Sequence, residues 1–301
     1  MSYIILDLEW NASYSTRLHG FVNEIIEFGA VKLDESYQIV DTFSVMVKPK
    51  IGKRLNGTVK KLTGISLAEL KSKGVGFLTA VQRFSDFLGE GTLMTWGTSD
   101  IHALLENFSY YTGDYHIPFL KTYCDLQEYC MKALNRFDEG NQMGLGACAE
   151  LLGLSFSEEE QHRAYADAYL SQKCLLALSD RLPLSSFVLR ADEEAFYERM
   201  TFKNYFITDL NSPEINKRDL RFRCDKCGKP VRRIKKWKLH NKNFSAEFRC
   251  KNCGRAFIGR ISFKKKYDGV RVNKRILEIV PKEKKKKETS KEQASATNTI
   301  L

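Results

Sequence analysis

Two cysteine motifs in the last third of the chain restrict its fold more than any other feature. The sequences CDKCG and CKNCG begin at residues 224 and 250, and 22 residues separate the two pairs. Four thiolates at this spacing suit one tetrahedral Zn²⁺, and the glycine after each pair allows the turn that points backbone N–H groups at sulfur. The motifs therefore predict a small zinc-ribbon β module over residues 221–263. Its structural zinc would be bound by Cys224, Cys227, Cys250 and Cys253.

Charge divides the chain into an acidic part and a basic part. Residues 1–180 contain 16 Lys and Arg against 23 Asp and Glu, whereas residues 181–301 contain 32 against 14. Such a division indicates two separate tasks, and a basic segment commonly binds phosphate. The alternative is a solvated basic surface without a partner.

The segment between the two cysteine motifs has the composition of a nucleic-acid-binding surface. Its basic residues interleave with Trp237, Phe244 and Phe248. Cations can bind phosphates while aromatic rings stack on bases, so Trp237 is a candidate base contact. Two alternatives remain open: the aromatic rings could fill the core of the ribbon, or the ribbon could bind protein.

The first part of the chain alternates strand-like and helix-like segments. Residues 3–10, 23–34 and 39–49 predict a three-stranded meander, and strands and helices then alternate as far as residue 180. This order predicts an α/β fold with a mixed sheet flanked by helices. The expected domains are a first domain (1–180), a connector (181–220), the ribbon (221–263) and a basic tail (264–301) that is disordered after about residue 282.

The sequence predicts no membrane partner. Its longest uncharged apolar runs fall far short of the roughly 20 residues that a membrane span needs, and the first residues lack the features of a signal peptide. We therefore expect an intracellular, cytoplasmic protein. Paired cysteines in that compartment favour metal over disulfides.

Two carboxylates lie in the apolar first strand, YIILDLEW. Asp7 and Glu9 are two residues apart, so their side chains point to the same face. Burying such a pair is costly unless a cation offsets the charge, and Mg²⁺ prefers carboxylate oxygens. The alternative is that this face is simply exposed to solvent.

Two later segments add candidate groups. Asp100 follows a buried strand at the start of a helix, where a carboxylate is also expected from the helix dipole alone. Asp167 shares a helix face with Ala164 and Ala168, whose small side chains would allow a ligand or the sheet to approach. His162 lies off that face by about 140° if the segment is helical, so it could face the same site only if it precedes the regular helix.

The order of these motifs resembles a known family. D-x-E, then W-G-x-x-D, then H-x-A-x-x-D-A, together with EIIEFGAV and LTGI, resembles the DEDDh-type, DnaQ-like 3′–5′ exonucleases over roughly residues 1–180. The DLEW opening and WGTSD are most similar to the Eri-type subgroup, which includes histone mRNA 3′-end exonucleases. The resemblance implies an RNase H-like fold.

The resemblance also implies the roles of the site residues. Two catalytic Mg²⁺ or Mn²⁺ ions would be held by Asp7, Glu9, Asp100 and Asp167. His162 would act as general base, a task that suits its near-neutral pKa.

The terminal nucleotide pocket would be lined by Trp10, Leu62 and Ile65, although Leu62 and Ile65 could equally be core residues. Trp10 departs from the family pattern, which usually has a small or hydroxyl residue after the Glu. It would narrow the pocket or provide a stacking surface.

The leading functional prediction is a metal-dependent 3′–5′ exonuclease. It would release nucleoside 5′-monophosphates from single-stranded nucleic acid or 3′ overhangs, with RNA favoured. One alternative is a 3′–5′ exodeoxyribonuclease in DNA repair or proofreading. The other is a catalytically inactive scaffold that binds nucleic acid.

Overall fold

The computed structural model describes residues 2–136, 142–155 and 163–279. The chain divides into two units, one ending at Thr201 and one beginning at Phe202. None of the helices in the described ranges combines the length and the apolar character that crossing a membrane requires.

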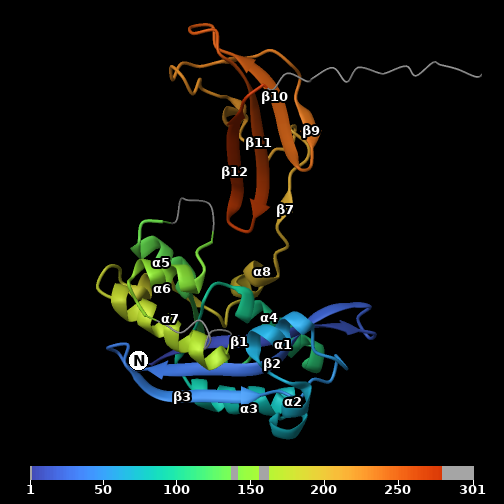
Figure 1. Ribbon diagram of the computed structural model, residues 1–301, viewed down its shortest axis with the longest axis vertical. Helices are drawn as coiled ribbons and strands as arrows, with labels where there is room; N and C mark the ends of the chain where they lie inside the picture. The colour runs from blue at the N-terminus through green and yellow to red at the C-terminus, as the bar shows by residue number, and fades with distance from the viewer. Residues whose placement is uncertain (1, 137–141, 156–162, 280–301) are drawn as a thin grey trace, which may run out of the picture. The chain divides into compact units, whose positions relative to one another are not determined.

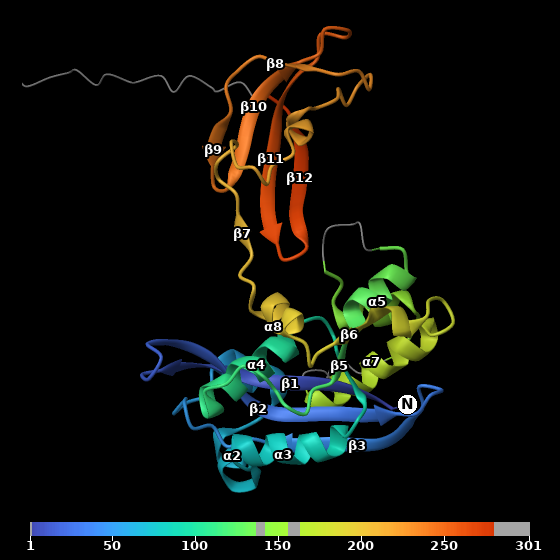
Figure 2. The same cartoon turned by 180° about the vertical axis from the view of Figure 1, so that it is seen from behind.

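A six-stranded sheet in the order β3-β2-β1-β4-β5-β6 forms the centre of the first unit (Figures 1 and 2). The antiparallel meander of the first three strands is confirmed, as is the mixed sheet, since β4 and β5 run parallel to β1. The strands are β1 (Tyr3–Ser15), β2 (Gly20–Leu33), β3 (Ile39–Met46), β4 (Thr92–Thr95), β5 (Thr122–Asp125) and β6 (Val188–Arg190). The helices are α1 (Gly57–Thr63), α2 (Leu67–Lys73), α3 (Phe77–Leu88), α4 (Ser99–Thr112), α5 (Leu126–Ala133), α6 (Leu145–Leu151), α7 (Ala164–Leu178), the 3₁₀ helix η2 (Leu184–Phe187) and α8 (Glu194–Thr201).

The two faces of the sheet are covered by different helices. Ile4, Leu6 and Leu8 of β1 pack in a core with residues of α3, α4 and α8, whereas Ile5 packs in a second core with residues of α5, α6 and α7. Side chains alternate along a strand, so Asp7 and Glu9 share the face of Ile5. The two carboxylates therefore lie on the side of the sheet that α7 covers.

The first unit extends further than the expected end at residue 180. β6 pairs antiparallel with β5, and Phe196, Tyr197 and Met200 of α8 are buried in the core with α3 and α4. Residues 181–201 therefore complete the first unit, and the expected connector over 181–220 is divided between the two units.

The second unit is a β module built around three long strands and a core of phenylalanines. Its sheet has the order β12-β11-β10-β8, with β7 paired to β11 and β9 paired to β10. The elements are β7 (Tyr205–Phe206), the 3₁₀ helix η3 (Lys217–Leu220), β8 (Arg232–Arg233), β9 (Lys238–His240), β10 (Asn243–Arg249), β11 (Ala256–Lys266) and β12 (Gly269–Leu277).

The expected basic tail needs a correction as well, because residues 264–277 are part of this sheet. β11 continues past residue 263, and β12 pairs with it over residues 258–277. The disorder expected after about residue 282 lies outside the described residues.

Candidate active site

Three of the predicted site carboxylates lie together on the covered face of the sheet. One oxygen from each of Asp7, Glu9 and Asp167 can be chosen so that all lie within 4.8 Å of one another. Asp7 and Glu9 come from β1, whereas Asp167 comes from the first turn of α7. Residues 158 positions apart in the sequence thus form one acidic cluster.

The close approach of α7 to the sheet depends on Gly29 of β2, which pairs with Asp7. A Cβ atom at Gly29 would lie only 2.1 Å from the backbone N of Tyr165 and 2.2 Å from the carbonyl carbon of Ala164. These are backbone atoms that cannot rotate away. The absence of a side chain at Gly29 therefore allows the first turn of α7 to rest on the strand beside Asp7, as the small residues of this helix predict.

Glu27 is a further acidic residue of the site, and sequence reasoning missed it. It pairs with Glu9 across the two strands, next to a β-bulge at Trp10, and its side chain is fully buried. The Arg163 guanidinium donates two hydrogen bonds to it, Nε to Oε2 at 3.1 Å and Nη2 to Oε1 at 2.6 Å. The Ala164 N–H donates a third bond at 3.3 Å. This ion pair ties the start of α7 to the sheet.

Asp100 lies beside this cluster and is held by the backbone of β1. β4 pairs with β1 only as far as Ile5. Beyond that point, the Leu8 N–H donates a hydrogen bond of 3.0 Å to Oδ1 of Asp100, which is buried in the first turn of α4. Asp100 therefore occupies the place that a longer β4 would otherwise fill.

Burial and mutual repulsion suppress ionisation of these acids. Burial raises the pKa of Asp7 well above its ordinary value, and the charges of Asp100, Asp167 and Glu9 raise it further. Burial likewise raises the pKa of Glu9 to about 8 and that of Asp100 to about 7. A cluster of oxygen donors that repel one another is a site that fits hard divalent cations, since these prefer carboxylate ligands.

The predicted general base, His162, lies outside the described residues. α7 begins at Ala164, with Arg163 in an extended conformation at its N-cap. The regular helix thus starts after residue 162, which is the arrangement that a His facing the cluster requires. The Ser157–Glu160 segment before it also lies outside the described residues.

The three predicted pocket residues differ in their surroundings. Leu62, near the end of α1, is 49% exposed, and Trp10 is half-buried against the core. Ile65 is fully buried and packs with Ile26 and Leu70. The structure therefore favours core packing for Ile65, places Trp10 partly in the core with Leu6 and Leu8, and leaves Leu62 accessible.

Asn11, which follows the bulge, holds the segment that leads to α1. Its Oδ1 accepts a hydrogen bond of 2.8 Å from the Asn56 N–H, and its Nδ2 donates one of 3.1 Å to the Arg54 carbonyl. Asn56 in turn caps α1 by accepting from the Thr58 N–H. The residues after the D-x-E motif thereby fix the helix that presents Leu62.

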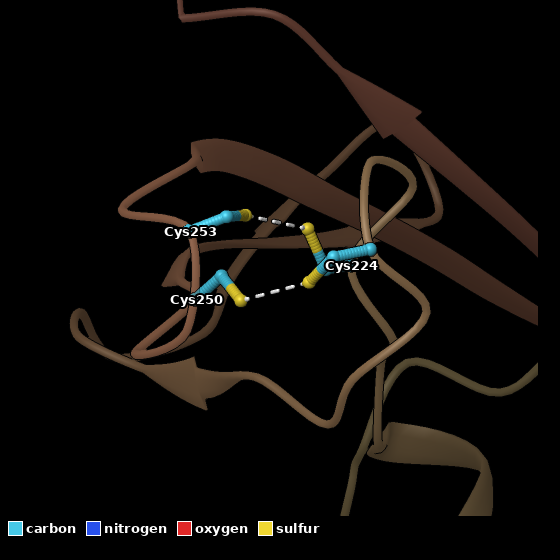
Figure 3. A group of neighbouring side chains, drawn as sticks. Cys224, Cys250 and Cys253 are labelled. Carbon is cyan, nitrogen blue, oxygen red and sulfur yellow. Dashed lines mark hydrogen bonds between the residues drawn. The ribbon is translucent and has the colours of Figure 1, made fainter.

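The second unit contains the predicted cysteine cluster. The four Sγ atoms of its two motifs lie within 4.8 Å of one another, and the Cys224–Cys253 and Cys227–Cys250 sulfur pairs are both 3.5 Å apart. Figure 3 shows Cys250 and Cys253 facing the first motif. Tetrahedral Zn–S bonds of about 2.3 Å would place sulfurs roughly 3.8 Å apart, so this donor set fits zinc.

Both cysteine motifs turn in the way that their glycines predict. Gly228 and Gly254 have φ angles of 69° and 73°, in the left-handed region that favours glycine. Backbone N–H groups of Cys253 and Asn252 lower the pKa of the Cys250 thiol, which favours the thiolate. Asp225 also accepts two hydrogen bonds of 2.8 Å from Arg255, which ties the two motifs together.

Trp237 lies against the core of this module rather than apart from it. Its ring is half-buried and contacts Phe222 and Phe248, with centroid distances of 6.3 and 5.7 Å. The Arg233 guanidinium lies 5.6 Å from the ring centre. This environment supports the core-filling alternative for Trp237.

Comparisons with known proteins agree with this arrangement. The family model RNase T, described as an exonuclease, matches residues 4–175. A solved full-length 3′-exonuclease is similar at a TM-score of 0.51 and 22% identity, over 63% of this chain and 89% of that one. A second 3′-exonuclease, solved in a study of 3′-end recognition of a histone mRNA stem-loop, gives 0.50 and 22%, over 60% and 81%. The structural similarity supports the RNase H-like exonuclease fold. No curated protein sequence matches the chain.

Proposed function

The chain belongs to the RNase T family of exonucleases, and from that premise we propose that it is a metal-dependent 3′–5′ exonuclease acting on single-stranded nucleic acid or 3′ overhangs. Its products would be nucleoside 5′-monophosphates. The observation that carries the proposal is the convergence of the carboxylates of Asp7, Glu9 and Asp167 on the face covered by α7. The preference for RNA follows from the sequence resemblance to the Eri-type subgroup.

Two divalent ions, Mg²⁺ or Mn²⁺, would be held by Asp7, Glu9, Asp100 and Asp167. When bound, such ions polarise the phosphodiester and lower the pKa of a coordinated water. The residues of the chain contribute position and charge: the Leu8 N–H fixes Asp100, and Gly29 allows Asp167 to reach Asp7.

His162 would accept the proton of the attacking water. Arg163, the next residue, is fixed by its two bonds to Glu27, so the chain is anchored at the point where the helix begins. Leu62 would contact the terminal nucleotide, since it is exposed on α1, and the part of the Trp10 ring that is not packed on the core would be a second contact. The second unit, with one structural Zn²⁺ on its cysteines, would bind the strand.

Degradation of a 5′-labelled single-stranded RNA with Mg²⁺ or Mn²⁺ tests the proposal. The wild type should produce a ladder that shortens from the 3′ end. Chelator and Asp7→Asn should abolish it, whereas Asp86→Asn, an exposed change on α3, should not. A DNA strand of equal length in parallel would identify an exodeoxyribonuclease. If both strands stayed intact while the chain still bound them, the scaffold alternative would replace the enzyme.

A further inference from the structure

A pocket in the second unit lies mostly outside the segment between the cysteine motifs, which contributes only Pro230 to its lining. It has a volume of about 580 Å³, within the range of roughly 300–1,000 Å³ that is usual for ligand sites. Its lining comes from the end of η3 and the residues after it, from Pro230 behind the first cysteine motif, and from β12. The lining residues are Arg218, Arg221, Phe222, Arg223, Pro230, Lys274, Arg275 and Ile276.

One side-chain and one backbone hydrogen bond hold these segments together. The Lys274 ammonium donates a hydrogen bond of 3.0 Å to the Arg221 carbonyl and lies 5.3 Å from the centre of the Phe222 ring. Phe222 is buried in the module core, and the Val231 N–H donates to its carbonyl at 3.3 Å. The pocket therefore has an apolar floor that is fixed by the fold and does not depend on a mobile loop.

The charge of the pocket is all of one sign. Five of its lining residues are cationic and exposed, and within the described ranges no acidic side chain lines it. Ion pairs elsewhere in the module, such as that of Asp225 with Arg255, are formed by residues that do not line the pocket. None of the five cations is paired with a carboxylate in the part of the chain that the structure describes. Cations that line one pocket repel one another, and an anion would relieve that repulsion.

We infer that this pocket binds the phosphate backbone of the single-stranded nucleic acid, an inference that rests on the proposed function because the ligand is the substrate strand of the enzyme. Four of the lining residues are arginines, and the planar guanidinium donates to two phosphate oxygens at once. Phe222 is buried, so its ring does not stack on a base. The pocket thus recognises backbone charge rather than sequence.

The pocket is also distinct from the segment that composition alone favours. In that segment Trp237 packs into the core and Lys235 pairs with Glu247. Exposed cations of that segment, such as Lys236 and Lys238, do not line the pocket, whereas five exposed cations around η3 and β12 do. The strand-binding site of the module is therefore placed on this pocket.

Binding of a fluorescent oligonucleotide of about 20 nucleotides to the zinc-loaded full chain tests the inference. An Asp7→Asn background would prevent cleavage. Arg221→Gln with Arg275→Gln should weaken binding at least about tenfold and reduce the salt slope by about 1.4, because each lost phosphate contact on a single strand removes about 0.7. Neither side chain makes a hydrogen bond or ion pair among the described residues, so zinc content should stay unchanged. Lys274→Gln is a second, independent variant.

Two matched pairs serve as controls. Lys71→Gln with Arg83→Gln removes the same charge from exposed positions of α2 and α3, and should leave affinity and slope nearly unchanged. Lys236→Gln with Lys238→Gln removes it from the segment between the cysteine motifs. If that second pair weakened binding more than the pocket pair, the site would lie on that segment and the inference would be overturned.

Further binding measurements identify the chemical class of the ligand. Oligonucleotides with a 5′-hydroxyl and a 5′-phosphate should bind equally, and a requirement for the 5′-phosphate would show a terminal-phosphate site instead. Competition by polyglutamate at equal charge would overturn the assignment in favour of an acidic protein partner.

Cleavage of a dinucleotide, with Asp7 intact, separates the two proposals. The variant with both pocket substitutions, Arg221→Gln and Arg275→Gln, should cleave it as the wild type does. A wild type that cleaves nothing would refute the nuclease but not the pocket.

Discussion

At the scale of single residues, the acidic cluster links protonation, metal and stability. A carboxyl group whose pKa is raised on folding binds more protons in the folded chain than in the unfolded chain. For Glu9 this holds between its ordinary value of 4.5 and about 8. The contribution of Glu9 to stability is therefore greatest at low pH and falls as the pH rises through this window.

The metal-free protein should accordingly lose stability as the pH rises. Between pH 6 and pH 8 the free energy of unfolding should fall by about 2 kcal/mol more in the wild type than in Glu9→Gln, because one pKa unit corresponds to 1.36 kcal/mol and Glu9 releases its proton in this range. Mg²⁺ should remove the difference by taking the place of the protons. Urea unfolding in chelator and in Mg²⁺ measures this, and parallel pH profiles for the two proteins would contradict it.

Substitution of Asp7 should be severe for activity. Asp7→Asn should lower the rate of cleavage about 10³-fold, since charge stabilisation by the metals is worth several kcal/mol in the transition state. The comparison is the steady-state rate beside Asp86→Asn at saturating Mg²⁺. A decrease of less than about tenfold would show that Asp7 is not a metal ligand.

Arg163 should act by positioning the start of α7 through its hydrogen bonds to Glu27. Arg163→Met leaves the buried Glu27 without its partner and should lower kcat about 10- to 100-fold with little change in KM, together with a loss of about 2 kcal/mol in stability. Arg163→Lys, which keeps the charge but not the fork, should recover part of kcat. Equal losses of kcat for Met and Lys would show that charge alone restores nothing, and an unchanged kcat in Arg163→Met would argue against a positioning role for Arg163.

At the scale of elements, the contact between β2 and α7 determines whether the cluster forms. Gly29→Ala would place a methyl group against the backbone of Tyr165 and Ala164, so α7 must shift away from β1. We expect a loss of about 1–3 kcal/mol from overpacking and a decrease in activity of about 10²-fold, because a shift of roughly 1 Å is enough to disturb such a site.

Gly76→Ala is the matched control for that change. It lies before α3 with φ −68°, and its added Cβ would meet nothing closer than Thr79 Oγ1 at 3.9 Å. Thermal unfolding and cleavage rate should both stay near the wild type. If Gly29→Ala behaved like this control, the position of α7 would not depend on the absence of a side chain at residue 29.

An element could be predicted from the sequence where residues near one another in the chain specify it, and was missed where distant residues do. The meander and the shared face of Asp7 and Glu9 follow from alternation within a strand. The face of α7 with small side chains, Ala164 and Ala168, follows from helical spacing. Glu27 was missed because its position opposite Glu9 depends on the pairing register of two strands. β6 was missed because it has only three residues. β12 was hidden by its charge, although Asp268-Gly269 before its alternating valines is a hairpin signal.

At the scale of the whole molecule, zinc and the catalytic ions should be separable. The free energy of structural zinc binding, about 10–16 kcal/mol in small zinc domains, is largely folding free energy. One zinc per chain is expected by elemental analysis, and none in Cys250→Ser. Cys148→Ala, in the first unit, should retain it.

Loss of zinc should also separate the two activities. The Cys250→Ser chain should still cleave a dinucleotide, because the first unit has its own cores, but should bind long strands poorly. If it lost dinucleotide cleavage as well, the first unit would not fold independently of the second.

The position of β12 has a consequence for solubility. Among the described strands it pairs only with β11, so its other edge presents unpaired backbone groups that could join the edge of a second copy. Its arginines and lysine oppose such pairing by repulsion, as charged edge strands do in other sheets. Neutralising them should therefore favour self-association at high protein concentration, and an excess of polyanion should have the same effect on the wild type.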